Sequence, residues 1–243
     1  MATPATVPLW VTEPRRATSL STVTARRGTW FALDRSLYAP TSRQYRHPQP
    51  HDQGYVWLQG TKRRLVEAQW RDGELWHRCR DWSPAVGDKL QCHLDADRRL
   101  EVSRAHTAMH LAIKALGDVG GVLRRDPEVK LGGTFRLDLA APLPAAALAE
   151  ARKRVMGWCR QGLTLANEAV LRTMQTRVLD PQPFESPDPF PGPPDSLMAV
   201  RVPGVCAYPC DGTHVDRTDR ISDVVSAEAK ATRAGFLLVG RVK

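Results

Sequence analysis

Two histidines four residues apart are the first candidates for chemistry. His106 and His110 lie in the segment Arg104-Ala-His-Thr-Ala-Met-His110, and the residues around them are rich in helix formers. Side chains four residues apart leave the same face of a helix in adjacent turns. One helix face would therefore present two imidazole nitrogens to one ion.

A cysteine and a third histidine form a second group far along the chain. The segment Cys210-Asp-Gly-Thr-His214 separates them by four residues, and Gly212 favours a turn that brings the thiolate and the imidazole to a common point. The chain has only five cysteines and seven histidines in 243 residues, so two such pairs favour a metal site over chance. Three imidazoles and a thiolate are a set that zinc accepts in tetrahedral geometry. The predicted cofactor is Zn²⁺, and the predicted ligands are His106, His110, Cys210 and His214.

The net charge of +9 favours an anionic partner. Most of the basic residues are arginines, and they occur in short groups between apolar segments, as in a folded surface that follows a phosphate backbone. An ordinary solvated basic face is the alternative. The groups are Arg15-Arg16, Arg26-Arg27, Lys62-Arg63-Arg64, Arg98-Arg99, Arg124-Arg125 and Arg152-Lys-Arg154.

Composition also limits the class of protein. No run of about 18 apolar residues suggests a membrane span, and the N-terminus does not resemble a signal peptide. The five cysteines are an odd, scattered set, which indicates reduced thiols rather than a disulfide framework. We therefore expect a cytoplasmic protein with no membrane partner, and no obligate protein partner is evident.

The elements that must position the ligands change in type near residue 103. Residues 1–16 are Pro-rich and are expected to form a flexible or lightly docked arm. Residues 17–102 contain short β segments between turn signals and predict a small β-barrel domain, whose last strand is expected at 100–102. Residues 103–243 predict an α+β domain that carries the zinc site, so the fold class is α+β with an N-terminal barrel. Its expected elements are a helix at 105–116, a strand at 129–139, a helix at 144–162, a Pro-rich loop at 181–194, and strands at 197–202 and 236–242.

Tryptophan is concentrated in the predicted barrel. Six of the seven tryptophans precede Arg104. We expect these six to form the core and rim of the barrel rather than a platform on which bases stack.

The segments around the candidate ligands resemble motifs of one family. His106-Thr-Ala-Met-His-Leu111 resembles the His-Thr-Ala-x-His-Leu motif, and Cys210-Asp-Gly-Thr-His-Val215 resembles the Cys-Gly-Gly-Thr-His-Val motif, of the alanyl-tRNA editing family. Tyr38-Ala-Pro-Thr-Ser42 and Gln49-Pro-His-Asp-Gln-Gly54 look like its Tyr-Pro-Thr-Ser-Gly-Gly-Gln-Pro-x-Asp-x-Gly segment. The family comprises the editing domain of alanyl-tRNA synthetase and the free-standing AlaX deacylases, and it is related to the editing domain of threonyl-tRNA synthetase. The resemblance covers roughly residues 20–243.

The resemblance implies a hydrolase that acts in trans on an aminoacylated tRNA. Such an enzyme cleaves the ester that links a wrong amino acid to the tRNA, and seryl- and glycyl-tRNA(Ala) are the usual substrates. The predicted catalytic residues are Thr41 and Gln49, which match family positions associated with substrate contact, and Thr213, which lies between two ligands. Ordinary surface or capping roles are the alternative for Thr41 and Gln49. The predicted substrate-binding residues are Asp211 and Gly212.

Two departures from the family pattern point to an unusual substrate. Asp211 stands where the second motif has glycine, and residues 43–48 replace a short Gly-Gly. An acidic side chain beside the metal would attract a substrate ammonium, and the rebuilt loop would change the size of the pocket. We therefore expect a specialised deacylase for a threonine-like or non-proteinogenic amino acid.

Two other functions are compatible with the same ligands. A zinc hydrolase of small acyl-amino-acid substrates would not need the basic surface, and the usual His-Glu-x-x-His base is absent because Thr107 follows His106. A non-catalytic tRNA-binding module with a structural zinc is the other alternative, since a closed four-ligand site is typical of structural zinc.

Overall fold

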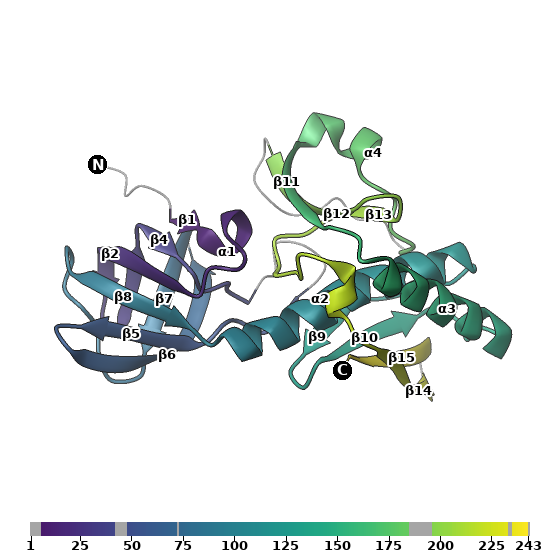
Figure 1. Ribbon diagram of the computed structural model, residues 1–243, viewed down its shortest axis with the longest axis horizontal. Helices are drawn as coiled ribbons and strands as arrows, with labels where there is room; N and C mark the ends of the chain where they lie inside the picture. Colours follow the sequence, from purple (N-terminus) through teal and green to yellow (C-terminus); the bar gives the residue numbers. More distant parts are fainter. Residues whose placement is uncertain (1–5, 42–47, 72, 185–195, 233–234, 243) are drawn as a thin grey trace. The chain divides into compact units, whose positions relative to one another are not determined.

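The protein divides into two compact units. The computed structural model describes residues 6–41, 48–71, 73–184, 196–232 and 235–242. The first unit comprises Met1–Ser42 and Pro50–Leu100, and the second comprises Arg43–Gln49 and Glu101–Lys243. The first contains a closed β-barrel and the second mixes helices and sheets (Figure 1), so the predicted α+β class with an N-terminal barrel is confirmed.

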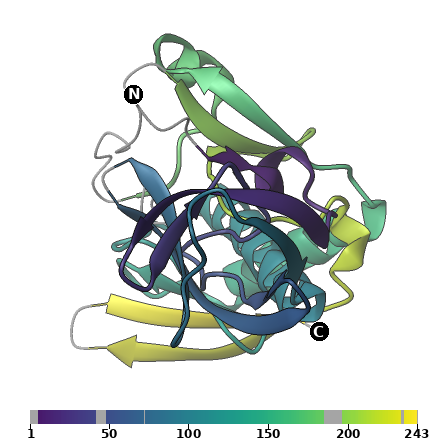
Figure 2. The same cartoon turned by 90° about the vertical axis from the view of Figure 1, so that its left-hand side faces the viewer.

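Six antiparallel strands close the barrel, and Figure 2 shows how they curve around. Burial alternates along β8 and the first part of β2: in β8, Leu90 and Cys92 are buried, whereas Lys89 and Gln91 are exposed. This period of two places one row of side chains inside the barrel and the other outside. In barrel order the strands are β2 (Thr18–Arg27), β3 (Trp30–Leu33), β7 (Glu74–Cys79), β6 (Thr61–Arg71), β5 (Gly54–Leu58) and β8 (Lys89–Leu94).

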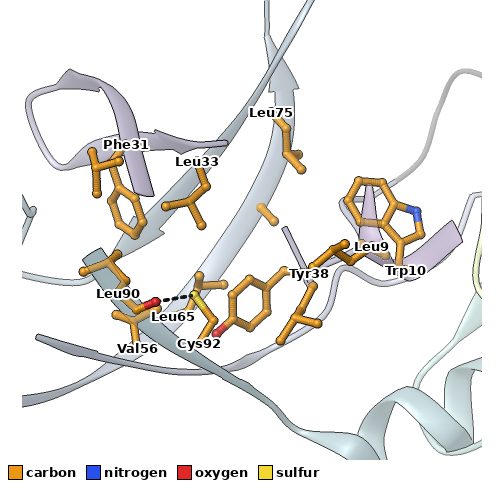
Figure 3. Close-up of a cluster of buried hydrophobic side chains, with 14 of the residues drawn as sticks. Leu9, Trp10, Phe31, Leu33, Tyr38, Val56, Leu65, Leu75, Leu90 and Cys92 are labelled. Carbon is orange, nitrogen blue, oxygen red and sulfur yellow. Dashed lines mark hydrogen bonds between the residues drawn. The ribbon is translucent and has the colours of Figure 1, made fainter. Parts of the chain in front are cut away.

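The core of the barrel extends to the start of the described chain. Inward-facing side chains such as Phe31 and Leu75 fill it, and Leu9 and Trp10 join the same cluster (Figure 3). Leu9 and Trp10 lie in α1 (Leu9–Thr12), which directly follows β1 (Val7–Pro8). Strand β1 pairs in parallel with β4 (Arg35–Ser36). The segment expected to be a flexible or lightly docked arm is therefore packed where it is described, because two large apolar side chains are removed from water.

A buried ion pair ties together the segments around the barrel end. Arg99 and Asp52 form a salt bridge, with side chains only 7% and 2% exposed. Asp52 also accepts a hydrogen bond from the backbone N–H of Ala39, and Arg99 donates one to the backbone oxygen of Leu37, each at 2.7 Å. Arg99 was expected on a basic surface, but its guanidinium is instead used to hold this part of the fold.

Helix α2 (Ala96–Asp118) begins earlier than the sequence predicts. The Asp95 carboxylate accepts a hydrogen bond from the backbone N–H of Arg98 at 3.1 Å, which caps the first turn. The strand predicted at 100–102 is wrong, because these residues continue the helix from this cap. Residues 105–113 are buried all round, as in a central helix covered on every side. Neither α2 nor any other helix in the described chain is both long and apolar enough to cross a membrane.

Two sheets complete the second unit. The single strand predicted at 129–139 forms two strands, separated by a turn in which Gly132 and Gly133 have positive φ. Strands β14 and β15 form a hairpin, drawn in yellow in Figure 2. The four-stranded sheet has the order β14 (Val224–Thr232), β15 (Gly235–Val242), β10 (Thr134–Leu139) and β9 (Glu128–Lys130), and the three-stranded sheet has the order β11 (Ala166–Leu171), β12 (Ser196–Val202) and β13 (Cys206–Pro209).

One long helix and three short helical segments complete the described part of this unit beside α2. Helix α3 (Ala145–Gln161) ends at Gly162, which adopts the left-handed conformation. The others are η1 (Arg172–Met174), α4 (Gln175–Val178) and η2 (Thr218–Arg220). Most of the Pro-rich loop predicted at 181–194 lies outside the described residues.

Removal of one member of the buried ion pair should destabilise the barrel unit strongly. We expect Asp52→Ala to lower the free energy of unfolding by about 3–5 kcal/mol, because the Arg99 charge would stay buried without its partner. Arg35→Ala is the control, since it breaks a pair with Asp34 in which the arginine side chain is 49% exposed. That change should cost less than about 1 kcal/mol. Chemical denaturation followed by circular dichroism measures both, and equal losses would contradict the structural role of Asp52.

Candidate metal centre

The second unit brings the four predicted ligands together. One nitrogen or sulfur atom from each of His106, His110, Cys210 and His214 lies within 4.8 Å of the others, and all four side chains are buried. Helix α2 supplies two histidines from adjacent turns, and the loop after β13 supplies the cysteine and the third histidine. The group could therefore hold a metal ion.

The distances inside this cluster suit a tetrahedral N/S site. His106 Nε2 lies 3.5 Å and His214 Nε2 3.3 Å from Cys210 Sγ. Typical Zn–N and Zn–S bond lengths in a tetrahedron separate nitrogen and sulfur by about 3.6 Å. The three imidazole rings lie close together, with centroid separations of 4.6 to 5.1 Å. Donor chemistry and spacing thus both fit the group that the sequence predicts.

The environment of the cysteine favours the protonated thiol when no cation is bound. Burial raises the pKa of Cys210, the nearby charge of Asp211 raises it further, and the backbone N–H of Gly212 lowers it. That N–H lies 3.4 Å from the sulfur. A thiolate here needs a positive charge beside it, and a metal ion at the cluster would supply that charge.

Gln49 fixes the orientation of the first histidine. Its side-chain oxygen accepts a hydrogen bond from the backbone N–H of Thr213 at 2.9 Å, so this atom is an acceptor. The same oxygen lies 2.7 Å from His106 Nδ1, which must therefore carry the proton. His106 Nε2 is then left with its lone pair and faces Cys210, as a metal ligand requires.

Thr107 makes the equivalent contact with His214. Its hydroxyl oxygen lies 3.3 Å from His214 Nδ1 and accepts a hydrogen bond from the backbone N–H of Val215 at 3.2 Å. The sequence reasoning did not assign a role to Thr107. Its position directly after His106 was the available signal, because a residue next to a ligand on a helix can reach a ligand that comes from another segment.

Gly212 is held where no side chain fits. A Cβ atom at this position would lie 2.2 Å from His106 Cε1, 2.6 Å from His106 Nδ1 and 2.8 Å from the oxygen of Gln49. Its observed neighbours are thus a predicted ligand and the side chain that orients it. The predicted contact of Gly212 with substrate remains a prediction.

The other predicted site residues lie in different surroundings. Thr213 is 2% exposed and its hydroxyl donates to the Gln49 oxygen at 3.3 Å, whereas Asp211 is partly exposed. Thr41 belongs to the first unit, where its hydroxyl lies 3.5 Å from His51 Nδ1. Of the rebuilt loop at 43–48, residues 43–47 lie outside the described residues.

Comparison with known proteins gives archaeal alanine–tRNA ligases as relatives. The chain is 30% identical to that of Methanothermobacter thermautotrophicus over 90% of its own length and 24% of the relative. It is 27% identical to that of Korarchaeum cryptofilum and 24% identical to that of Methanopyrus kandleri, over 84% and 86% of its length and 22% of each relative. No family model matches.

The matched region covers most of this chain, and the similarity is consistent with the alanyl-tRNA editing family. The chain spans about a quarter of the length of the curated relatives that it matches.

A side chain at position 212 should disrupt the cluster. We expect Gly212→Ala to reduce bound metal to less than about half of the wild-type stoichiometry, because its Cβ overlaps the imidazole of His106. Metal analysis of the purified variant by mass spectrometry measures this. Gly157→Ala is the control, since a Cβ there meets no atom within 4 Å. Wild-type metal content in the Gly212 variant would contradict the steric role.

Loss of the Thr107 hydroxyl should weaken metal binding without abolishing it. We expect Thr107→Val to lower metal affinity by about 10–100-fold, because His214 loses the group that orients its ring. Competition against a chromogenic chelator measures the affinity. Thr218→Val removes another buried hydroxyl, which bonds to the backbone of Trp158 and Leu163. This control should lower stability but leave metal affinity unchanged, and the opposite pattern would contradict the role of Thr107.

Proposed function

We propose that the protein is an aminoacyl-tRNA deacylase that hydrolyses the ester of a mischarged tRNA. The observation that carries the proposal is the buried cluster of His106, His110, Cys210 and His214, formed by the two segments that resemble the motifs of the editing family. Zinc is the proposed metal, because it accepts imidazole and thiolate together. When bound, it would activate a water molecule or polarise the ester carbonyl.

Gln49 is the residue best suited to contact the reacting ester. Its oxygen is used by His106 and Thr213, but its buried amide nitrogen has no hydrogen-bond partner among the residues that the structure describes. A buried hydrogen-bond donor without a partner is unfavourable unless a bound ligand accepts its hydrogen bond. The Gln49 Nε2 would donate to the ester oxygen on which negative charge develops, as in an oxyanion hole.

Thr213 and Asp211 are proposed to hold the amino-acid part of the substrate. The Thr213 hydroxyl donates to Gln49, so its oxygen remains an acceptor for a substrate hydroxyl or ammonium. The Asp211 carboxylate is partly exposed and would attract the α-ammonium group. Thr41 and Gly212 keep their predicted roles as a catalytic and a substrate-binding residue.

The proposed substrate is a specialised aminoacyl-tRNA. Seryl- and glycyl-tRNA(Ala) are the usual substrates that the resemblance implies, but Asp211 and residues 43–48 depart from the family pattern. A threonine-like or non-proteinogenic amino acid fits a site that gains an acidic side chain. A site that hydrogen-bonds a substrate hydroxyl discriminates strongly against analogues without it.

The test is deacylation of tRNAs charged with serine, glycine, alanine or threonine. We expect turnover by the wild-type protein and a loss of at least about 100-fold in kcat/KM for His110→Ala and Cys210→Ala, since loss of a ligand should cost more than loss of the groups that orient it. Both variants should also lose bound metal. Thr218→Val serves as a folding control with a buried change elsewhere in the same unit.

Several outcomes would contradict the proposal. Full activity in metal-free variants would exclude the metal from the reaction. Hydrolysis of free acyl-amino-acid esters, but not of aminoacyl-tRNA, would identify a small-molecule hydrolase. Binding of tRNA without turnover would identify a non-catalytic module, and hydrolysis of seryl- and glycyl-tRNA(Ala) alone would exclude the specialised substrate.

A further inference from the structure

The outer face of the barrel carries two rows of side chains that cross four strands. Cross-strand pairing joins β6 to β5, β5 to β8 and β8 to β2. On β5, β8 and β2 the intervening side chains of Val56, Cys92 and Ser19 are buried, so the rows point outward there. On β6, Lys62 and Arg64 are both exposed. The first row is Arg64, Tyr55, His93 and Thr18, and the second is Lys62, Trp57, Gln91 and Leu20; together they are named the barrel strip.

Three aromatic rings lie in succession on the barrel strip. The centroids of Tyr55 and Trp57 are 6.0 Å apart, and those of Trp57 and His93 are 4.3 Å apart. Tyr55 is 38% exposed, and Leu20, at the end of the second row, is 56% exposed. The prediction that the tryptophans form only core and rim therefore does not describe Trp57, which is partly exposed in the middle of an outer sheet face.

Cations accompany these rings. Lys62 Nζ lies 3.8 Å from the Tyr55 centroid and 4.9 Å from that of Trp57. Arg64, at the end of the first row, lines a surface hollow of about 480 Å³ together with Gln53, Val66 and Arg80. None of the eight residues of the barrel strip carries a carboxylate, so its ionic side chains are all basic.

We infer that the barrel strip binds an RNA strand, and this inference rests on the proposed function, in which the substrate is a tRNA. Unpaired bases stack on exposed aromatic rings, and phosphates pair with the lysine and arginine side chains that flank them. Tyr55 and Trp57 would contact bases. Lys62, which is exposed and flexible, would leave the rings for a phosphate, and the hollow beside Arg64 and Arg80 would receive the next phosphate.

Another part of the same barrel provides the internal control. The guanidinium of Arg71 lies 3.8 Å from the Trp30 ring, the same distance as Lys62 from Tyr55. Arg78 also contacts Trp30, but it is paired with Glu67 at 2.7 Å. Lys62 and Arg71 thus share one strand and one type of contact, and they differ in the charge and aromatic content of their surroundings.

The experiment measures binding of uncharged tRNA to the full chain by fluorescence anisotropy across a range of salt concentrations. We expect Lys62→Ala and Arg64→Ala each to raise Kd by several-fold and to reduce the slope of log K against log salt by about one. Tyr55→Ala should raise Kd by about tenfold with an unchanged slope, and Tyr55→Phe should restore binding. Arg71→Ala should leave Kd unchanged, and thermal melting of each variant checks its fold.

The outcomes separate this inference from the proposed function. Hydrolysis of aminoacyl-tRNA together with unchanged Kd in the Lys62 and Tyr55 variants would overturn the inference alone, whereas RNA binding through the barrel strip without hydrolysis would support the inference and contradict the function. If Arg71→Ala raised Kd as much as Lys62→Ala, the inference would be overturned, because tRNA would then bind the basic surface through non-specific electrostatic attraction. Displacement of tRNA by poly-glutamate as readily as by unlabelled RNA would also overturn the inference, in favour of an acidic protein partner.

Discussion

The candidate metal centre depends most on the hydrogen bonds accepted by the side-chain oxygen of Gln49. This oxygen accepts hydrogen bonds from His106 Nδ1 and from the backbone and hydroxyl of Thr213, which come from helix α2 and from the loop after β13. One atom thereby orients a ligand from each of the two segments, directly for His106 and through the adjacent Thr213 for His214. The chain holds Gln49 in place through Pro48, whose oxygen accepts a hydrogen bond from the N–H of Val129 in β9 at 3.0 Å.

The two pairs of ligands are supported in different ways. His106 and His110 lie on a helix that is buried on all sides, so their spacing is fixed by regular backbone geometry. Cys210 and His214 lie on a loop, whose start is fixed because the N–H of Cys210 donates to the oxygen of Met198 in β12 at 2.9 Å. The far end of the loop is fixed because the backbone N–H of Val215 donates a hydrogen bond to the hydroxyl oxygen of Thr107 in α2. Helix α2 therefore carries two of the predicted ligands and supports the loop beside His214, whereas β12 supports the loop at Cys210.

Sequence reasoning succeeded where periodic patterns or local spacing determine structure. The barrel follows from short β segments between turn signals, and the four-residue spacing predicts that the two members of each ligand pair lie close together. That the two pairs meet was predicted from their ligand chemistry and from the resemblance to the family motifs. Sequence reasoning failed where a long-range partner decides the role of a residue. The sequence predicts a surface cation at Arg99, because nothing local indicates its salt bridge with Asp52. It likewise predicts a strand at 100–102, because the cap at Asp95 that starts the helix was not recognised. Gly212 and Thr107 likewise depend on contacts made more than a hundred residues apart along the chain.

The geometry of the loop explains why its departure from the family pattern falls at Asp211. Three positions separate Cys210 from His214. Position 212 has no room for a Cβ, and Thr213 is buried and bonded to Gln49 through both its backbone and its hydroxyl. Asp211 is partly exposed, and among the three it is the position at which a larger side chain does not displace the ligands. A change of charge beside the metal centre can thus alter what the site attracts while the cluster itself is retained.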